Sequence, residues 1–352
     1  MVKSLVLHIG DPKTGTNAVQ HVLGNHLYEC EDKSLFFLPS RFAHELAEKL
    51  MQQNGNSDAD ISAYLRPFAE RYNKSDADIG VISSDKFASS DPARLHALIT
   101  GHFEVDEKDL KVVSYLRPHC DALTSRYAQQ VKTGQFTGTL DQFYALRKAS
   151  LNYTRRIRKW KNVFGDNHSF HLFSRDALEG GDIVVDFFKN ALKLENVTLQ
   201  ESQLANQSPS VKELSVIRQY YLNVLGDHPG KIRKMQDYDK PWTKIDKYFL
   251  SKTQDVGEIE RVTIHKKLWE KIQPRLAADA RRVDKMLKTK DFFGAALERY
   301  EAKVVRKAQD LSMSANFSPE EERILQSLLL GIQELKNEAD SNAKTQASNS
   351  EG

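Results

Sequence analysis

The feature that most constrains the fold is an alternation of short apolar runs with helical patterns through about the first 190 residues. The apolar runs are expected to be strands because they are short and bounded by Gly, Pro or Asp. Buried strands that alternate with helices form a mostly parallel sheet with helices on both faces. The sequence therefore predicts an α/β fold, with strands expected within residues 4–9, 34–39, 79–84, 110–116 and 168–176.

The later part of the chain has a different character. From about residue 209 onward the strand signals fade and long helical patterns follow. We therefore expect three parts: an α/β core over residues 1–225, a helical region over 226–336, and a small, polar, disordered tail over 337–352. Within the helical region, the spacing of Ser318 and Glu321 matches a capping box that opens a helix.

Composition narrows the class of protein. The formal net charge is +3 over 352 residues, which indicates no general affinity for nucleic acid or anionic membranes. The two cysteines, Cys30 and Cys120, lack the spacing of a disulfide framework or a zinc site and fit a reducing compartment. Asp11 and Lys13 interrupt the first apolar run, and no later run approaches membrane-spanning length. The expectation is a cytoplasmic protein without a transmembrane segment.

A glycine-rich turn, GDPKTGTN at residues 10–17, separates the first expected strand from a helical pattern. An ATPase P-loop reads G-x-x-x-x-G-K-[ST], and its final Lys and Ser/Thr serve the phosphates and Mg²⁺. Here Thr16 and Asn17 occupy those two positions, whereas Lys13 lies inside the loop. The backbone amides at this helix N-terminus suit one phosphate, so a ligand that reacts without a divalent metal fits better than ATP. The alternative interpretation is a tight strand-to-helix turn, with Thr16 or Asn17 as the helix cap.

A second pair of residues also favours a phosphate ligand. Arg117 ends the fourth expected strand, and Ser125 follows eight residues later in the next helix. A guanidinium and a hydroxyl together suit a phosphate separate from the one in the loop. The alternative is that Arg117 binds backbone carbonyls and Ser125 lies on a helix surface.

The two segments together resemble a known family. HIGDPKTGTNAVQ followed by YLRPHCDALTSRY is similar to the sulfotransferases that use 3′-phosphoadenosine 5′-phosphosulfate (PAPS), particularly bacterial enzymes that modify carbohydrates or related acceptors. In that family a P-K-T-G-T-T loop binds the 5′-phosphosulfate, and an R-P-x(6)-S-x-Y segment binds the 3′-phosphate. The resemblance extends over roughly residues 4–222, and the matching motif positions are Lys13, Thr14, Gly15 and Thr16 in the loop, and Arg117, Pro118, Ser125 and Tyr127 in the second segment.

The resemblance implies a P-loop-like sulfotransferase fold in which residues 1–225 bind PAPS and residues 226–336 serve acceptor specificity or partner binding. It implies transfer of a sulfuryl group from PAPS to a hydroxyl or amine of a small molecule or glycan, with release of adenosine 3′,5′-bisphosphate and no metal requirement. Lys13 would neutralise charge on the departing bisphosphate. Asn17 departs from the family pattern, which has a second Thr there, so one hydroxyl contact becomes an amide contact.

Two residues are candidates for the base that deprotonates the acceptor. His44 follows the second expected strand, and an imidazole suits proton transfer at neutral pH. Asp85 follows the third strand, where relatives tend to have Glu. Each also has a plain structural interpretation, His44 as a helix residue and Asp85 as a helix cap. His8, inside the first strand, is interpreted as structural, and the basic run at 155–161 as a helix surface.

Two other functions stay open from the residues. The first is an ATP-dependent, kinase-like phosphotransferase, which needs a lysine after Gly15 and a carboxylate for Mg²⁺; the lysine is missing and Asp85 is the carboxylate candidate. The second is a non-catalytic nucleotide-binding or assembly protein of the same fold, which the departures at Asn17 and Asp85 would suit.

Overall fold

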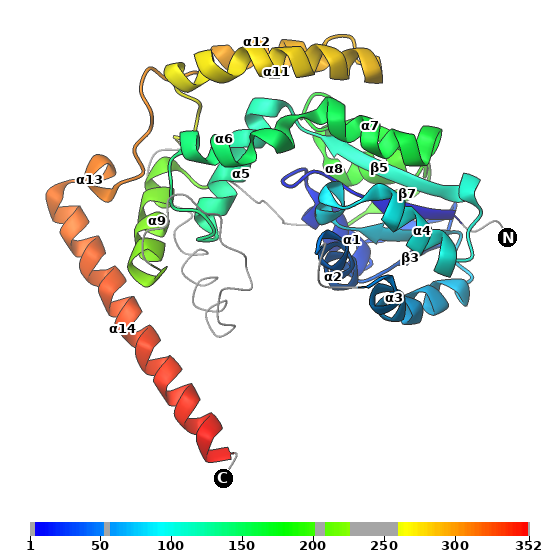
Figure 1. Cartoon of the computed structure of the whole chain (residues 1–352), viewed down its shortest axis with the longest axis horizontal. Coiled ribbons are helices and arrows are strands. Elements are labelled where there is room, and N and C mark those ends of the chain that lie inside the picture. Colours follow the sequence, from blue (N-terminus) through cyan, green and yellow to red (C-terminus); the bar gives the residue numbers. More distant parts are fainter. Residues whose placement is uncertain (1–3, 53–56, 201–207, 226–259, 351–352) are drawn as a thin grey trace. The chain divides into compact units, whose positions relative to one another are not determined.

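Five parallel strands form the central sheet of the protein, in the order β3-β4-β1-β5-β6. The computed structural model describes residues 4–52, 57–200, 208–225 and 260–350 (Figure 1). Each strand of the sheet lies within a segment where the sequence predicts one, and the α/β class is confirmed. The strand bounds are β1 Ser4–His8, β3 Leu35–Phe37, β4 Ile79–Ser83, β5 Leu110–Leu116 and β6 His168–Leu172.

The first strand lies at the centre of this sheet and sets its register. β1 pairs with β4 on one side and with β5 on the other, so that His8 lies opposite both Ser83 and Val113. The chain fills the β3–β4 side first and then adds β5 and β6 on the other side, so the strand order reverses beside β1. In open parallel sheets, ligands bind at such a reversal, beyond the carboxyl ends of the strands.

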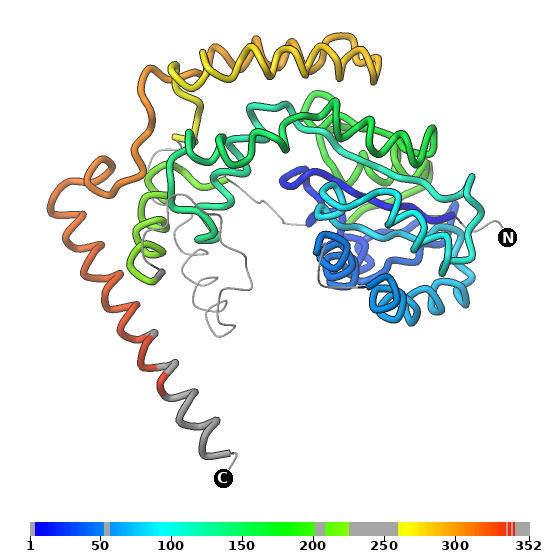
Figure 2. The backbone as a smooth tube through the Cα atoms, in the orientation of Figure 1, coloured from blue at the N-terminus to red at the C-terminus, as the bar shows by residue number. Residues whose placement is uncertain are grey.

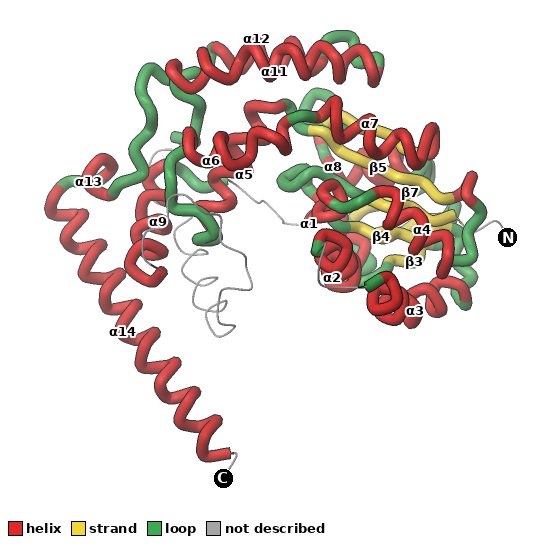
Figure 3. Tube along the Cα trace, in the orientation of Figure 1, coloured by secondary structure: helices red, strands yellow, loops and turns green. Residues whose placement is uncertain are grey.

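Helices cover both faces of the sheet (Figures 1 and 3). Because side chains alternate along a strand, Leu5 and Leu7 enter one core and Val6 enters the other. The core around Leu5 and Leu7 is closed by α2 Ser40–Met51, α3 Asp58–Asn73, α4 Pro92–His102 and α7 Tyr153–Phe164. The opposite core is closed by α1 Thr16–Gly24, α8 Ile183–Asp186 and the π-helical turn Phe187–Ala191.

A second, two-stranded sheet was not predicted from the sequence. β2 Tyr28–Cys30 pairs with β7 Val197–Leu199 in an antiparallel ladder. Three-residue strands with half-exposed side chains carry too short a pattern to be recognised, and their pairing joins segments that are far apart in the chain.

The chain divides into two compact units that are each built from several segments. Figure 2 lets the reader follow these segments by residue number. The first unit consists of residues 1–122, 152–205 and 277–296, and the second of residues 123–151, 206–276 and 297–352. This division is interleaved, whereas the sequence predicts a single boundary at residue 225. The separate roles assigned to 1–225 and 226–336 stay predictions, and residues 226–259 lie outside the described residues.

The described part of the second unit is helical. Its small core joins α9 Val211–Leu225 to α13 Met313–Asn316 and α14 Pro319–Ser350. Ser318 and Glu321 form the predicted capping box, in which the Ser318 amide donates to Glu321 Oε2 at 2.8 Å. The structure continues α14 to Ser350, so the segment predicted as a disordered tail is helical there; its Ala, Lys, Glu and Gln are good helix formers. The unit also contains α6 Leu140–Arg147, and three helices are shared between the units: α5 His119–Lys132, α11 Lys266–Leu287 and α12 Phe292–Glu301.

No helix among the described residues combines the length and the apolar character needed to cross a membrane.

Candidate functional site

The loop between β1 and α1 is a tight turn that depends on Gly15. Gly15 is the N-cap of α1 and has a φ of 76°, a conformation that favours glycine. A Cβ at this position would lie 2.7 Å from Cγ2 of Ile183, so packing also excludes a side chain. The turn is closed by Thr14, whose hydroxyl donates to the Asp11 carbonyl at 2.6 Å. The helix therefore begins at Thr16 with glycine as its cap, and the prediction of Thr16 or Asn17 as the cap was wrong.

Lys13 is held in a left-handed backbone conformation, with a φ of 69°. Its carbonyl accepts a hydrogen bond from Nη1 of Arg117 at 3.0 Å. Arg117 follows β5, where its guanidinium lies 5.6 Å from the centroid of the Phe173 ring and its own carbonyl accepts from Tyr153 Oη at 2.9 Å. The structure thus brings together two predicted site residues that are 104 positions apart, and Arg117 contacts the loop itself.

A buried ion pair anchors the start of the loop. Asp11 is 2% exposed, and its Oδ2 lies 2.7 Å from Nη2 of Arg156 on α7. The Arg156 guanidinium also lies over the Tyr153 ring, 4.6 Å from its centroid. The sequence pattern places Arg156 in a basic run that is expected to cover a helix surface. Tyr153, Ile157 and Trp160 recur at helical spacing and form the buried face of α7. Arg156 lies beside this face, so the helical spacing could have distinguished it from the other basic residues of the run.

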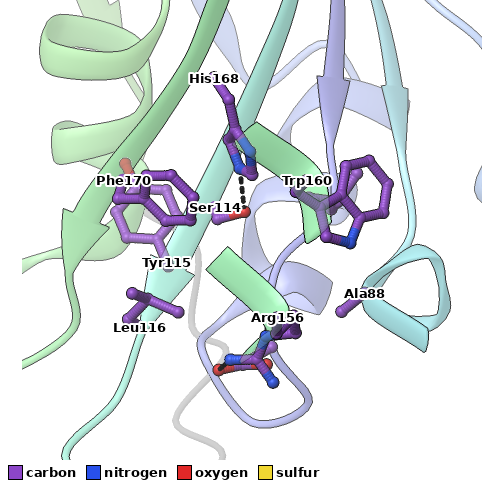
Figure 4. Close-up of a pocket in the computed structure, with 10 residues that line it drawn as sticks. Ala88, Ser114, Tyr115, Leu116, Arg156, Trp160, His168 and Phe170 are labelled. Carbon is purple, nitrogen blue, oxygen red and sulfur yellow. Dashed lines mark hydrogen bonds and ion pairs between the residues drawn. The ribbon is translucent and has the colours of Figure 1, made fainter. Parts of the chain in front are cut away.

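Asp11 and Arg156 share a small cavity of about 10 Å³ with residues of β5 and β6, several of which are drawn in Figure 4. In it the His168 ring points towards Ser114, with Nε2 2.7 Å from the serine hydroxyl. Burial lowers the pKa of His168 to about 3, so this histidine is neutral. A cavity of this size holds one water molecule and is too small for a substrate.

Two buried polar atoms at the base of the loop have no hydrogen-bond partner among the described residues. They are the hydroxyl oxygen of Thr16, which is 4% exposed, and Nε2 of His8, which is fully buried. The Thr16 residue also opens α1, and first-turn amides have no acceptor within their own helix. A buried hydroxyl without a partner at a helix N-terminus fits an anion such as a phosphate.

His44 and Asp85 lie near the carboxyl end of β4, the strand that pairs with β1. Nδ1 of His44, on α2, is 2.6 Å from the hydroxyl of Ser84, the residue before Asp85. The Ser84 amide donates to the His8 carbonyl at 3.0 Å, which ties this segment to the end of β1. Burial lowers the pKa of His44 below its usual value, an effect that the nearby Asp85 carboxylate opposes. The structure therefore gathers both base candidates in one place.

The remaining predicted residues occupy separate positions. Asn17 is exposed in the first turn of α1. Ser125 lies on α5, is 8% exposed and belongs to the second unit, whereas Arg117 belongs to the first, so the proposed pairing of these two stays a prediction. Tyr127 donates to the carbonyl of Gly138 at 2.9 Å, which is a contact within the second unit.

Comparison with known proteins gives remote similarity among solved structures only. No protein-family model matches the chain, and no curated protein matches it. Among solved structures, the chain is similar to the crystal structure of a sulfotransferase from Alicyclobacillus acidocaldarius, with 14% identity over 82% of this chain and 97% of that chain and a TM-score of 0.41.

Proposed function

We propose that this protein is a sulfotransferase that moves a sulfuryl group from PAPS to a hydroxyl of a small-molecule or glycan acceptor and releases adenosine 3′,5′-bisphosphate. The observation that carries the proposal is the partnerless, buried hydroxyl of Thr16 at the N-terminus of α1, in a loop that also contains Lys13. This constellation suits an anionic group at the loop. The motif resemblance of residues 10–17 and 117–127 supports the phosphosulfate of PAPS as that group.

The same loop argues against an ATP-dependent phosphotransferase. A P-loop needs a lysine after its last glycine and a hydroxyl on the next residue for Mg²⁺. In this chain Thr16 follows Gly15 and the exposed amide of Asn17 comes next. In sulfuryl transfer from PAPS, positively charged side chains and backbone amides can stabilise the developing charge without a metal. Lys13 and the first turn of α1 supply such groups.

In the proposed reaction the acceptor oxygen attacks sulfur in line with the bond to the bridging phosphate oxygen. The new S–O bond forms as that bond breaks, the bridging oxygen leaves with the bisphosphate, and the acceptor proton passes to a base of the protein. Lys13 stabilises the negative charge that develops on the leaving group. Arg117 fixes Lys13 through its carbonyl, which keeps the loop in one geometry before the nucleotide binds.

His44 or Asp85 takes the acceptor proton. The lowered pKa of His44 keeps its imidazole neutral at neutral pH, as a base must be. To accept at Nε2, His44 has to carry its own hydrogen on Nδ1 and donate it to Ser84. The Ser84 oxygen then accepts from both Nδ1 of His44 and the Lys86 amide.

The experiment that tests the function is calorimetric binding of adenosine 3′,5′-bisphosphate to the native protein, in buffer without divalent metal. We expect tight binding that is lost in Lys13→Ala, and weak binding of ATP with or without Mg²⁺. Absence of bisphosphate binding, or ATP binding that depends on Mg²⁺, would contradict the proposal. A positive result is followed by a screen of hydroxylated acceptors with PAPS.

A further inference from the structure

His8 and Thr16 place two partnerless polar atoms beside one small volume. A Cβ added to Gly10 would lie 2.8 Å from Oγ1 of Thr16 and 3.1 Å from Nε2 of His8. The two atoms are therefore at most about 6 Å apart, beside a glycine that has no side chain. Both residues are more than nine-tenths buried. Buried polar groups are nearly always hydrogen-bonded, so this pair points to an oxygen atom that is bound there.

The hydrogen bonds around Ser83 decide which nitrogen of His8 carries the hydrogen. Gln20, on α1, donates from Nε2 to the Ser83 carbonyl at 2.7 Å and to its hydroxyl oxygen at 3.3 Å. The Ser83 hydroxyl is 2.9 Å from Nδ1 of His8, its only acceptor among the described residues. We assign Ser83 as the donor to Nδ1, because this arrangement gives its hydroxyl hydrogen an acceptor, and the neutral His8 ring then carries its hydrogen on Nε2. Nε2–H is thus a donor without an acceptor at the base of the loop.

The His8 ring is fixed in this orientation by aromatic neighbours. The Tyr115 ring meets it edge-on at 5.8 Å between centroids, and the Phe187 ring lies at 4.9 Å. Burial lowers the pKa of His8 to about 3, so the ring stays neutral at physiological pH. A fixed neutral donor costs no reorganisation when an anion binds.

We propose that Nε2–H of His8 and the hydroxyl of Thr16 bind one oxygen of the anionic group held by the 10–17 loop. This makes His8 a binding residue for the 5′-phosphate of the nucleotide, in place of the structural role that the sequence suggests. The inference rests on the proposed function for the identity of the nucleotide, but the two donors suit a phosphate or sulfate oxygen in general.

The test measures the dissociation constant of adenosine 3′,5′-bisphosphate and the thermal midpoint of the free protein for four variants. His8→Phe removes both ring nitrogens, and His8→Gln keeps an amide donor. Thr16→Val removes the hydroxyl, and Thr16→Ser keeps it. We expect His8→Phe and Thr16→Val each to weaken binding roughly 10- to 100-fold, as loss of a hydrogen bond to a charged group does, with smaller losses in His8→Gln and Thr16→Ser. The double variant His8→Phe/Thr16→Val should lose less than the product of the two single losses, because both residues hold the same oxygen.

His168 provides a matched control. It too is buried, neutral and bonded to a strand serine, and its Nδ1 lacks a partner among the described residues, but it begins β6 and does not face Gly10. His168→Phe should change the thermal midpoint and leave the dissociation constant unchanged. The inference is overturned if His8→Phe folds and binds the bisphosphate as the native protein does, because His8 would then bind only structural water.

Inorganic pyrophosphate separates the two proposals. If the native protein binds pyrophosphate but not adenosine 3′,5′-bisphosphate, and pyrophosphate binding falls in His8→Phe and Thr16→Val, the anion site stands and the sulfotransferase proposal fails. If the bisphosphate binds equally to native protein and both variants, the reverse holds. If neither ligand binds the native protein, both proposals fail.

Discussion

Nη1 of Arg117 donates a hydrogen bond to the backbone carbonyl of Lys13 at 3.0 Å. The arginine that the family resemblance predicts for the 3′-phosphate of the nucleotide therefore holds the loop predicted for the 5′ end. A guanidinium has five N–H donors, so both contacts are compatible with one side chain. The two roles nevertheless make different predictions for Arg117 variants.

If Arg117 acts through its hydrogen bond to Lys13, Arg117→Ala should weaken the binding of ligands with and without a 3′-phosphate, because the loop loses this hydrogen bond in both cases. The measurement compares dissociation constants of adenosine 3′,5′-bisphosphate and AMP. Arg117→Lys keeps the charge and serves as the control for simple electrostatic attraction. A loss confined to the 3′-phosphorylated ligand would instead assign Arg117 to that phosphate alone.

Gly15→Ala should destabilise the protein by about 1–3 kcal/mol, because alanine is strained at a φ of 76° and its Cβ would meet Ile183. Chemical denaturation measures the free energy of unfolding. Adding Ile183→Ala should not restore the native value, since it relieves the contact but not the backbone strain. The matched control is Gly101→Ala in α4, where no heavy atom lies within 4 Å of the added Cβ and about 0.5–1 kcal/mol of stabilisation is expected.

His44→Ala and Asp85→Asn should separate the two base candidates. The variant that loses the base should reduce kcat by about 10²–10⁴-fold with PAPS and an acceptor, and should bind adenosine 3′,5′-bisphosphate normally. If His44 is the base, Ser84→Ala should also lower kcat, because the Ser84 hydroxyl is hydrogen-bonded to Nδ1 of His44 at 2.6 Å. Full activity of both single variants would remove this cluster from the mechanism.

Stability should fall as the solution is acidified below about pH 6.5. Burial lowers the pKa of both His8 and His168 to about 3, so the unfolded chain takes up protons at pH values where the folded protein does not. Their neutral forms therefore contribute fully above pH 6.5, and stability is lost as the pH falls from 6.5 towards 3. Each histidine accounts for about 2 kcal/mol between pH 6.5 and 5. Urea titrations across this range should show a shallower pH dependence in His168→Phe, and an unchanged slope would show that His168 does not carry this effect.

The sheet could be predicted because buried parallel strands leave a strong local signal. The runs around Val6, Ile82 and Val113 are apolar, short and followed by turn residues, and all three became strands or strand ends. The position of the loop followed from the same logic, since the carboxyl end of a central strand is where ligands bind.

The side-chain contacts that hold the loop in place could not be predicted, because they join segments that are far apart in the sequence. Asp11 and Arg156 are 145 positions apart, and only the folded chain shows that one basic residue of a helix reaches a buried carboxylate. The partnerless Nε2 of His8 depends likewise on Gln20, Ser83 and the small size of Gly10. The interleaved units escaped prediction for the same reason, as local patterns do not show which later segment returns to an earlier one.

Lys13 has a φ of 69°, in a region where glycine or asparagine is the more comfortable residue. An engineer who optimised this turn for stability alone would replace the lysine, and we expect Lys13→Gly to raise the thermal midpoint. The native sequence instead keeps a long, charged side chain where the backbone disfavours it. This conflict between local preference and residue identity is what we expect at a position where the chain gives up stability for chemistry, as the proposed role of Lys13 requires.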